Sequence, residues 1–183
     1  APEGPVENLL AVRTTGDGKH FAFAGHLDVV PPGEGWTNDA FAPTRHGDLL
    51  YGRGAVDMKG SIAAFVAAVA RAGETAGTIS LLITGDEEGD AIYGTRALML
   101  HMAERGVTPD LCLVGEPTSV NKLGDMIKIG RRGSVNMWIN VAGMQGHVAY
   151  PHLAKNPIPP LLRILTAIEA IELDQGTDWF QPS

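Results

Sequence analysis

The sequence predicts an α/β fold: a doubly wound sheet with helices on both faces, followed by the start of a smaller α+β domain. Short apolar runs alternate with longer helical patterns in the order strand, helix, strand, helix, strand, which is typical of a sheet with crossover helices. The pattern changes near Gly130, beyond which one alternating strand and one helix are expected. The 183 residues are enough for one moderate domain and part of another.

The first part of the chain predicts three short strands. Residues 8–13 and 21–24 are expected to be strands on either side of the turn Thr15-Gly-Asp-Gly. Residues 31–36, Pro-Pro-Gly-Glu-Gly-Trp, have the composition of a loop. Residues 48–51 suit a further short strand, so the chain begins as a strand-rich segment.

The middle of the chain predicts the alternation of helices and buried strands. Small and apolar residues over 58–71 suit a buried helix, and the run 78–84 suits a fully buried strand of the parallel-sheet type. Residues 94–104 are expected to form a helix that ends at Gly106 as its C-cap. Residues 111–114 complete the series as another short buried strand.

The last part of the chain has a different pattern of apolar and polar residues. Residues 134–141 alternate apolar and polar side chains, as a half-exposed antiparallel strand does. A proline-rich opening at 157–160 is expected to lead into an amphipathic helix over 161–173. One strand and one helix cannot close a core. We therefore expect one domain over 1–130, a partial domain over 131–183, and a complete protein that extends further.

Charge and hydropathy argue against two classes of partner, nucleic acid and membrane. The net charge of −7 argues against nucleic acid, and no apolar run reaches the roughly 18 residues that span a bilayer. The single cysteine, Cys112, cannot form an internal disulfide, and we expect it to be a buried core thiol. A chain without disulfides is consistent with a cytoplasmic protein.

Acidic and imidazole side chains follow apolar runs at four places in the chain. They are His26 with Asp28, then Asp57, then the pair Glu87 and Glu88, and finally Glu116. Because ligands bind at the carboxyl ends of strands in open α/β sheets, we expect these side chains to meet. Carboxylates with one imidazole suggest a divalent-metal site for one or two ions. A second glutamate beside a ligand glutamate suggests hydrolysis, because some group must take a proton from water.

Each of these side chains also has an ordinary structural explanation. His26 and Asp28 could be a surface pair, and Asp57 could be the N-cap of the helix that follows it. The run of carboxylates at 86–88 could be a solvated acidic turn, and Glu116 an inert loop residue. The metal interpretation therefore depends on the four places occurring together.

Two further features suggest substrate recognition. Lys128, Arg131 and Arg132 form a basic cluster in an acidic chain, which suits an anionic substrate or simply a solvated hinge. His147 lies in a glycine-flanked segment, where it is either a surface histidine or a hydrogen-bond donor to a developing oxyanion.

Longer motifs around these residues carry a family resemblance. They are Gly25-His-Leu-Asp-Val-Val-Pro-Pro-Gly, Tyr51-Gly-Arg-Gly-Ala-Val-Asp-Met-Lys-Gly, Asp86-Glu-Glu-Gly, Gly115-Glu-Pro-Thr and Gly130-Arg-Arg-Gly-Ser. Together they resemble the co-catalytic metallopeptidase family that includes aminoacylases, acetylornithine deacetylase and dipeptidases. Residues 143–157 narrow the resemblance to bacterial members that hydrolyse N-succinyl-LL-2,6-diaminopimelate in diaminopimelate and lysine biosynthesis.

The resemblance implies a role for each matching residue. His26 and Glu116 would bind a first zinc and Glu88 a second, Asp57 would bridge them, Asp28 would orient His26, and Glu87 would be the general base and acid. Lys128, Arg131, Ser134 and Tyr150 would contact substrate carboxylates, while His147 would reach into a partner subunit's site. The resemblance also implies that cobalt can replace zinc, that the protein is a homodimer acting on a small anionic N-acyl amino acid, and that the Asp57–Met58 peptide is cis.

One part of the family pattern is absent from these 183 residues. The family's second-zinc histidine lies near the end of a longer chain, and no histidine follows His152 here. We therefore expect an internal segment of the enzyme that is inactive alone. The alternatives are an acetylornithine deacetylase, another amidohydrolase or peptidase of the family, or a non-catalytic fragment.

Overall fold

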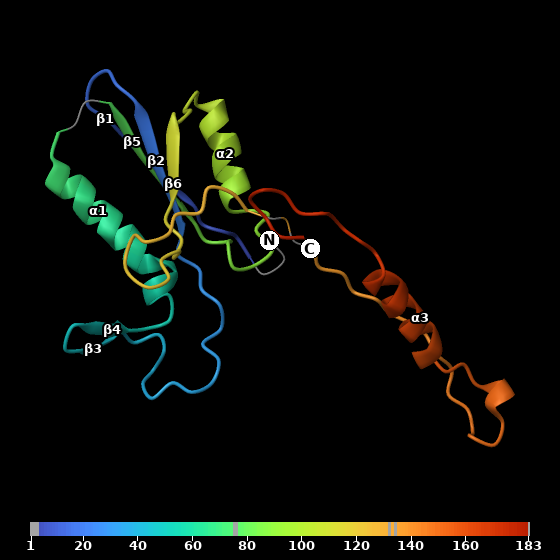
Figure 1. The fold of residues 1–183 in the computed structure, drawn as a ribbon. Helices are drawn as coiled ribbons and strands as arrows, with labels where there is room; N and C mark the ends of the chain where they lie inside the picture. Colours follow the sequence, from blue (N-terminus) through green and yellow to red (C-terminus); the bar gives the residue numbers. More distant parts are fainter. Residues whose placement is uncertain (1–3, 75–76, 132, 134, 183) are drawn as a thin grey trace. The chain divides into compact units, whose positions relative to one another are not determined.

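The computed structural model describes residues 4–74, 77–131, 133 and 135–182. The chain forms two compact units, Ala1–Ile127 and Lys128–Ser183. The first unit contains a four-stranded sheet, a two-stranded sheet and two α-helices, and the second contains a 3-10 turn and one α-helix (Figure 1). The assignment of a catalytic domain to 1–130 and a partial dimerisation domain to 131–183 stays a prediction.

The main sheet of the first unit has the strand order β1-β5-β2-β6. These strands are β1 Leu9–Thr14, β5 Thr78–Thr84, β2 His20–His26 and β6 Leu111–Val114. Strand β2 runs parallel to both β5 and β6, whereas β1 is antiparallel to β5, so the sheet is mixed. The chain passes from β2 to β5 on one side and later to β6 on the other. The carboxyl ends of three strands therefore meet at a point where the strand order reverses, the usual place for a ligand.

The two helices of the first unit cover opposite faces of this sheet, as predicted (Figure 1). Their bounds are α1 Gly60–Ala72, which follows a π-helical turn at Ala55–Lys59, and α2 Thr95–Glu104. Successive side chains of a strand point to opposite faces. Phe23 of β2 stacks on Phe65 of α1 with ring centroids 4.4 Å apart, while its neighbour Ala22 packs with Leu98 and Met102 of α2.

Turns mark the end of α2 and connect two short strands. Gly106 follows α2 with a φ of 67°, the left-handed conformation expected of a helix-ending glycine. Residues 44–51 form a small hairpin of β3 Thr44–His46 and β4 Leu49–Tyr51, of which only the second strand was predicted.

Within the described ranges, no helix combines the length and the apolar character that a membrane crossing requires.

Three predictions of burial are wrong. No residue of α1 is fully buried, because only one of its faces packs on the sheet. Strand β6 is exposed as well, with Leu111 62% and Val114 58% accessible, because it lies at the sheet edge and pairs only with β2. Cys112 of β6 is consequently exposed and is not a core thiol. Apolar sequence predicted burial here, but the described part of the chain supplies nothing to cover these surfaces.

The second unit confirms its helix but not its strand. The helix α3 spans Ile158–Glu169, and a 3-10 turn covers Pro151–Leu153. Residues 135–141 have no regular secondary structure, although a strand was predicted there. A strand needs a hydrogen-bonding neighbour, and the described residues of this unit offer only a single bridge, between Met144 and Lys155.

Candidate metal centre

The fold brings the predicted acidic and imidazole residues of the first unit to one edge of the sheet. His26 is the last residue of β2, and its side chain is 1% exposed. Glu87 and Glu88 lie in the loop after β5, and Glu116 lies two residues past β6. Asp57 comes from the π-helical turn before α1. Because β2, β5 and β6 are parallel, their following loops emerge side by side and their side chains converge.

The imidazole of His26 is held from both sides. Its Nδ1 lies 2.9 Å from the backbone carbonyl of Asp28, and its Nε2 lies 3.0 Å from a carboxylate oxygen of Asp57. A carbonyl oxygen can only accept, so Nδ1 carries a proton and Nε2 faces the carboxylates. The Asp28 carboxylate is 3.6 Å from Nδ1, which is longer than a hydrogen bond. Asp28 thus orients the ring through its main chain.

Further carboxylates surround Nε2. Glu116 Oε1 lies 3.7 Å and Glu87 Oε2 3.9 Å from it. Among the described residues, two groups of three side chains could each hold a metal ion: His26 with Asp57 and Glu88, and His26 with Glu87 and Glu116. Within each group, the potential ligand atoms all lie within 4.8 Å of one another. One imidazole with several carboxylates is a donor set that zinc accepts.

The carboxylates of this cluster shift the pKa values of its members. Burial lowers the pKa of His26, but the Asp28 carbonyl, the Asp57 hydrogen bond and the charges of Glu116 and Glu87 together raise it above 6.5. Burial first, and then the charges of Asp57 and Glu87, raise the pKa of Glu116 above 4.5 against the opposing effect of His26. The crowded carboxylates thus favour the protonated form of the His26 imidazole. A bound cation in the proton's place would offset the same repulsion, so the residues fit a metal.

The alternative explanation of Asp57 as a helix cap is wrong. The residue that precedes α1 is Lys59, and no side chain caps the helix. The carboxylate of Asp57 instead faces His26. The Asp57–Met58 peptide bond is cis, as the family resemblance implied.

Met58 is a feature of the site that the sequence alone did not single out. Its side chain is 0% exposed, and its sulfur accepts the backbone N–H of His26 at 3.3 Å. A Cβ on Gly25 would lie 2.6 Å, and one on Gly115 2.8 Å, from its terminal methyl group. Each glycine directly precedes a donor of the cluster, His26 or Glu116. The glycines in these motifs are the signal that could have predicted a side chain packed beneath the site.

The remaining predicted site residues belong to the second unit. Lys128, Arg131, His147 and Tyr150 are all exposed, whereas Ser134 and Arg132 lie outside the described residues. The backbone N–H of Ala149 donates to His147 Nδ1 at 3.1 Å, so a neutral ring carries its proton on Nε2. The rings of His147 and Tyr150 lie 5.9 Å apart.

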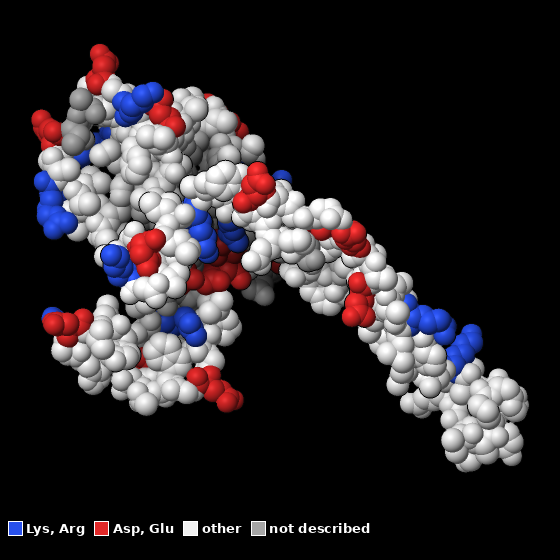
Figure 2. Space-filling view, in the orientation of Figure 1, with Lys and Arg blue, Asp and Glu red and all other residues white. Residues whose placement is uncertain are grey.

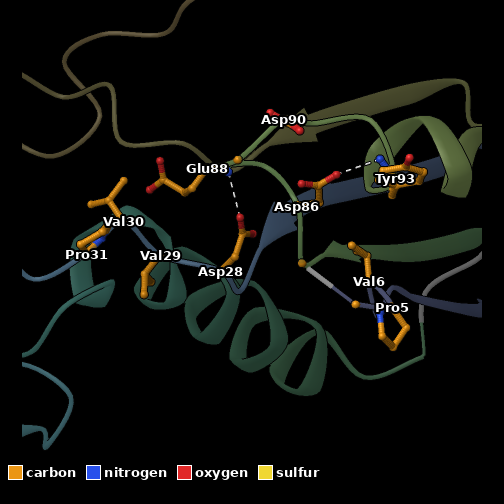
Figure 3. Close-up of a pocket in the computed structure, with 13 residues that line it drawn as sticks. Pro5, Val6, Asp28, Val29, Val30, Pro31, Asp86, Glu88, Asp90 and Tyr93 are labelled. Carbon is orange, nitrogen blue, oxygen red and sulfur yellow. Dashed lines mark hydrogen bonds between the residues drawn. The ribbon is translucent and has the colours of Figure 1, made fainter. Parts of the chain in front are cut away.

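A cavity of about 430 Å³ adjoins the cluster (Figure 3). Asp28 and Glu88 line it together with Asp86, Asp90 and Tyr93. Over the molecular face shown in Figure 2, acidic and basic side chains are interspersed, and a group of acidic ones lies near the middle of the view. The cavity therefore borders the cluster on the side of Glu88.

Comparisons with known proteins agree with this geometry. Residues 22–180 match the peptidase family M20/M25/M40. The chain is 75% identical over 182 residues to a succinyl-diaminopimelate desuccinylase of Sphingopyxis alaskensis and 61% identical over 183 residues to one of Zymomonas mobilis. All of this chain aligns in both cases, with 48% of each relative, so the chain spans about half the length of the curated relatives it matches.

A solved structure also matches the chain, at a lower sequence identity. The crystal structure of human carnosine dipeptidase 1 matches with a TM-score of 0.50 and 30% sequence identity, over 58% of this chain and 24% of that one. The family match covers most of the chain and includes every residue of the cluster. The chain therefore belongs to the peptidase family M20/M25/M40, a family of metal-dependent hydrolases.

Proposed function

We propose that this chain is part of a cytoplasmic amidohydrolase that releases succinate from N-succinyl-LL-2,6-diaminopimelate, in diaminopimelate and lysine biosynthesis. The observation that carries the proposal is the convergence of His26 with carboxylates from three loops at the carboxyl edge of the sheet. The 75% identity to a succinyl-diaminopimelate desuccinylase supports the choice of substrate. The activity is proposed for a protein of the relatives' length, about twice that of this chain.

Two zinc ions, or cobalt in their place, are the proposed cofactors. His26 and Glu116 would hold the first ion, Glu88 the second, and Asp57 would bridge the two. A further histidine ligand for the second ion is expected outside these 183 residues. Bound zinc would act as a Lewis acid toward the amide carbonyl and make water more acidic.

Glu87 is the proposed proton carrier. Its side chain is 38% exposed and its Oε2 lies 3.9 Å from His26 Nε2, so water and substrate can reach it beside the metal ligands. The carboxylate would take a proton from the attacking water and return it to the leaving nitrogen. That return releases the amine of LL-2,6-diaminopimelate and succinate.

Substrate binding is assigned to the second unit. Lys128, Arg131, Ser134 and Tyr150 would contact the carboxylates of a small anionic N-acyl amino acid. His147 would donate from Nε2–H to the developing oxyanion in a partner subunit's site, which requires a homodimer. The hydrogen bond from Ala149 to Nδ1 supports this role, because it leaves Nε2–H as the outward donor. A monomer by light scattering at working concentration would contradict the proposed dimer.

The decisive experiment replaces Glu87 in the protein at its relatives' length. Glu87→Gln keeps the size of the side chain but removes the base, and should lower kcat by about 10²–10⁴-fold while zinc content stays unchanged. Glu104→Gln, at the exposed end of α2, is the matched control and should be neutral. Turnover of Glu87→Gln close to that of the control would refute the assigned role.

Two alternative functions have their own tests. The first alternative is another activity of the same family: peptide hydrolysis, for which the likeness to a dipeptidase structure is the supporting observation, or acetylornithine deacetylation. A panel of succinyl, acetyl and peptide substrates, ranked by kcat/KM, separates these. A non-catalytic role for the 183 residues is tested by zinc calorimetry on this chain beside the longer protein. Two tight zinc ions on the short chain would contradict our expectation of an incomplete site.

A further inference from the structure

The carboxylate of Asp28 connects two strand ends of the metal centre. Asp28 lies two residues beyond β2, and its Oδ2 accepts the backbone N–H groups of both Glu87, at 2.9 Å, and Glu88, at 2.8 Å. Figure 3 shows the second of these bonds. Both donors lie in the loop that follows β5. An ionised acceptor makes such hydrogen bonds shorter and stronger than neutral ones. One side chain therefore holds two consecutive peptide groups of the acidic turn.

This contact is separate from the orientation of His26. The ring nitrogen Nδ1 bonds to the Asp28 carbonyl, so the carboxylate is not needed as its acceptor. The second carboxylate oxygen of Asp28, Oδ1, is buried without a hydrogen-bond partner and lies 3.6 Å from Nδ1. The main chain of Asp28 sets the imidazole, while its side chain sets the turn that carries the two glutamates.

We propose that Asp28 is a positioning residue that fixes the spacing of Glu87 and Glu88 relative to His26. Adjacent side chains point in different directions, and here Glu88 joins the donor group of Asp57 while Glu87 joins that of Glu116. This division depends on the backbone torsions of the turn. Two hydrogen bonds to one rigid acceptor restrict those torsions. The inference rests on the proposed function in that the two glutamates serve metal binding and proton transfer.

The same loop contains a matched control. Asp86 accepts the backbone N–H groups of Ile92, at 3.0 Å, and Tyr93, at 2.8 Å, through one carboxylate oxygen. Its chemistry is that of Asp28, but its carboxylate closes the far end of the loop and accepts no hydrogen bond from the amides of Glu87 and Glu88. Loss of Asp86 should loosen the loop without releasing the two glutamates.

Amide hydrogen exchange on the metal-free chain tests the clamp without any need for catalysis. In Asp28→Ala, exchange at the Glu87 and Glu88 amides should accelerate on the order of tenfold, as expected for a lost hydrogen bond. Asp28→Asn should keep both amides protected, because its side-chain oxygen still accepts. Asp86→Ala should expose only the amides of Ile92 and Tyr93.

Zinc calorimetry then tests the positioning. In the protein at its relatives' length, Asp28→Ala should weaken zinc binding by about 10–100-fold, the usual effect of removing a group that supports metal ligands, and Asp86→Ala should leave it near normal. Unprotected Glu87 and Glu88 amides in the unmodified chain, or loss of protection in Asp28→Asn, would overturn the clamp. The Asn variant decides this even if Asp28→Ala does not fold. Unchanged zinc affinity in Asp28→Ala, whether or not its Glu87 and Glu88 amides stay protected, would overturn the positioning role. Failure to hydrolyse any substrate, with the clamp intact, would count against the proposed function alone.

Discussion

Met58 offers the sharpest test of how the fold supports the metal centre. Its side chain is fully buried between Gly25 and Gly115, and its sulfur accepts the N–H of His26. Truncation in Met58→Ala removes three buried heavy atoms and leaves that N–H without its acceptor. Buried Met-to-Ala changes cost about 2–5 kcal/mol, so we expect a loss of this size in the free energy of unfolding.

Two variants provide the comparison. Met58→Leu keeps the volume but not the sulfur, and should cost less than about 1.5 kcal/mol. Met99→Ala, in a side chain of α2 that is 62% exposed, should stay within about 0.5 kcal/mol of the unmodified chain. Urea unfolding of the metal-free chain, with amide exchange in β2 and β5 to report on the first unit, gives the three values. A Met58→Ala loss no larger than that of Met99→Ala would refute the reasoning.

Two further predictions concern the cluster itself. His26 and Glu116 both have raised pKa values, so the folded chain binds their protons more tightly than the unfolded chain does. The metal-free chain should therefore lose stability as the pH rises from below 6.5 to above it, and thermal unfolding that shows the opposite slope would contradict this. Saturating zinc should reduce or reverse the slope, because zinc replaces those protons. Separately, Gly115→Ala would drive a Cβ into the ring of Phe23, and should both destabilise the chain by about 1–3 kcal/mol and weaken zinc binding through Glu116. Unchanged calorimetric affinity in a folded Gly115→Ala protein would show that the displacement does not reach the site.

Local sequence predicted most elements of the first unit to within a few residues. The run 78–84 coincides with β5, and the glycine after α2 adopts the left-handed conformation that was expected. These features depend on short-range sterics and on hydrophobic periodicity, and both are determined by residues that are neighbours along the chain. The strand predicted at 134–141 depended on a partner strand, which the residues themselves cannot supply.

Burial was the least predictable property of the fold. The helix α1 and the strand β6 are as apolar as buried elements, yet each has a face that the described part of the chain leaves uncovered. Whether an apolar side chain is buried depends on what packs against it from elsewhere. That information is not contained in the element's own sequence.

The sequence by itself determined which chemical groups are present and that they follow strand ends. His26, Glu87, Glu88 and Glu116 were identified in this way, because the carboxyl ends of parallel strands share one edge. Asp57 was identified by the same rule, but it reaches the cluster from the π-helical turn before α1 and not from a strand of that sheet. Only the tertiary structure decided how those groups are held. The Asp28 side chain accepts hydrogen bonds from the turn of another strand, and its carbonyl orients the imidazole. Hydrogen bonds depend on tenths of an ångström and on angles between distant segments, and these are fixed only when the whole sheet has folded.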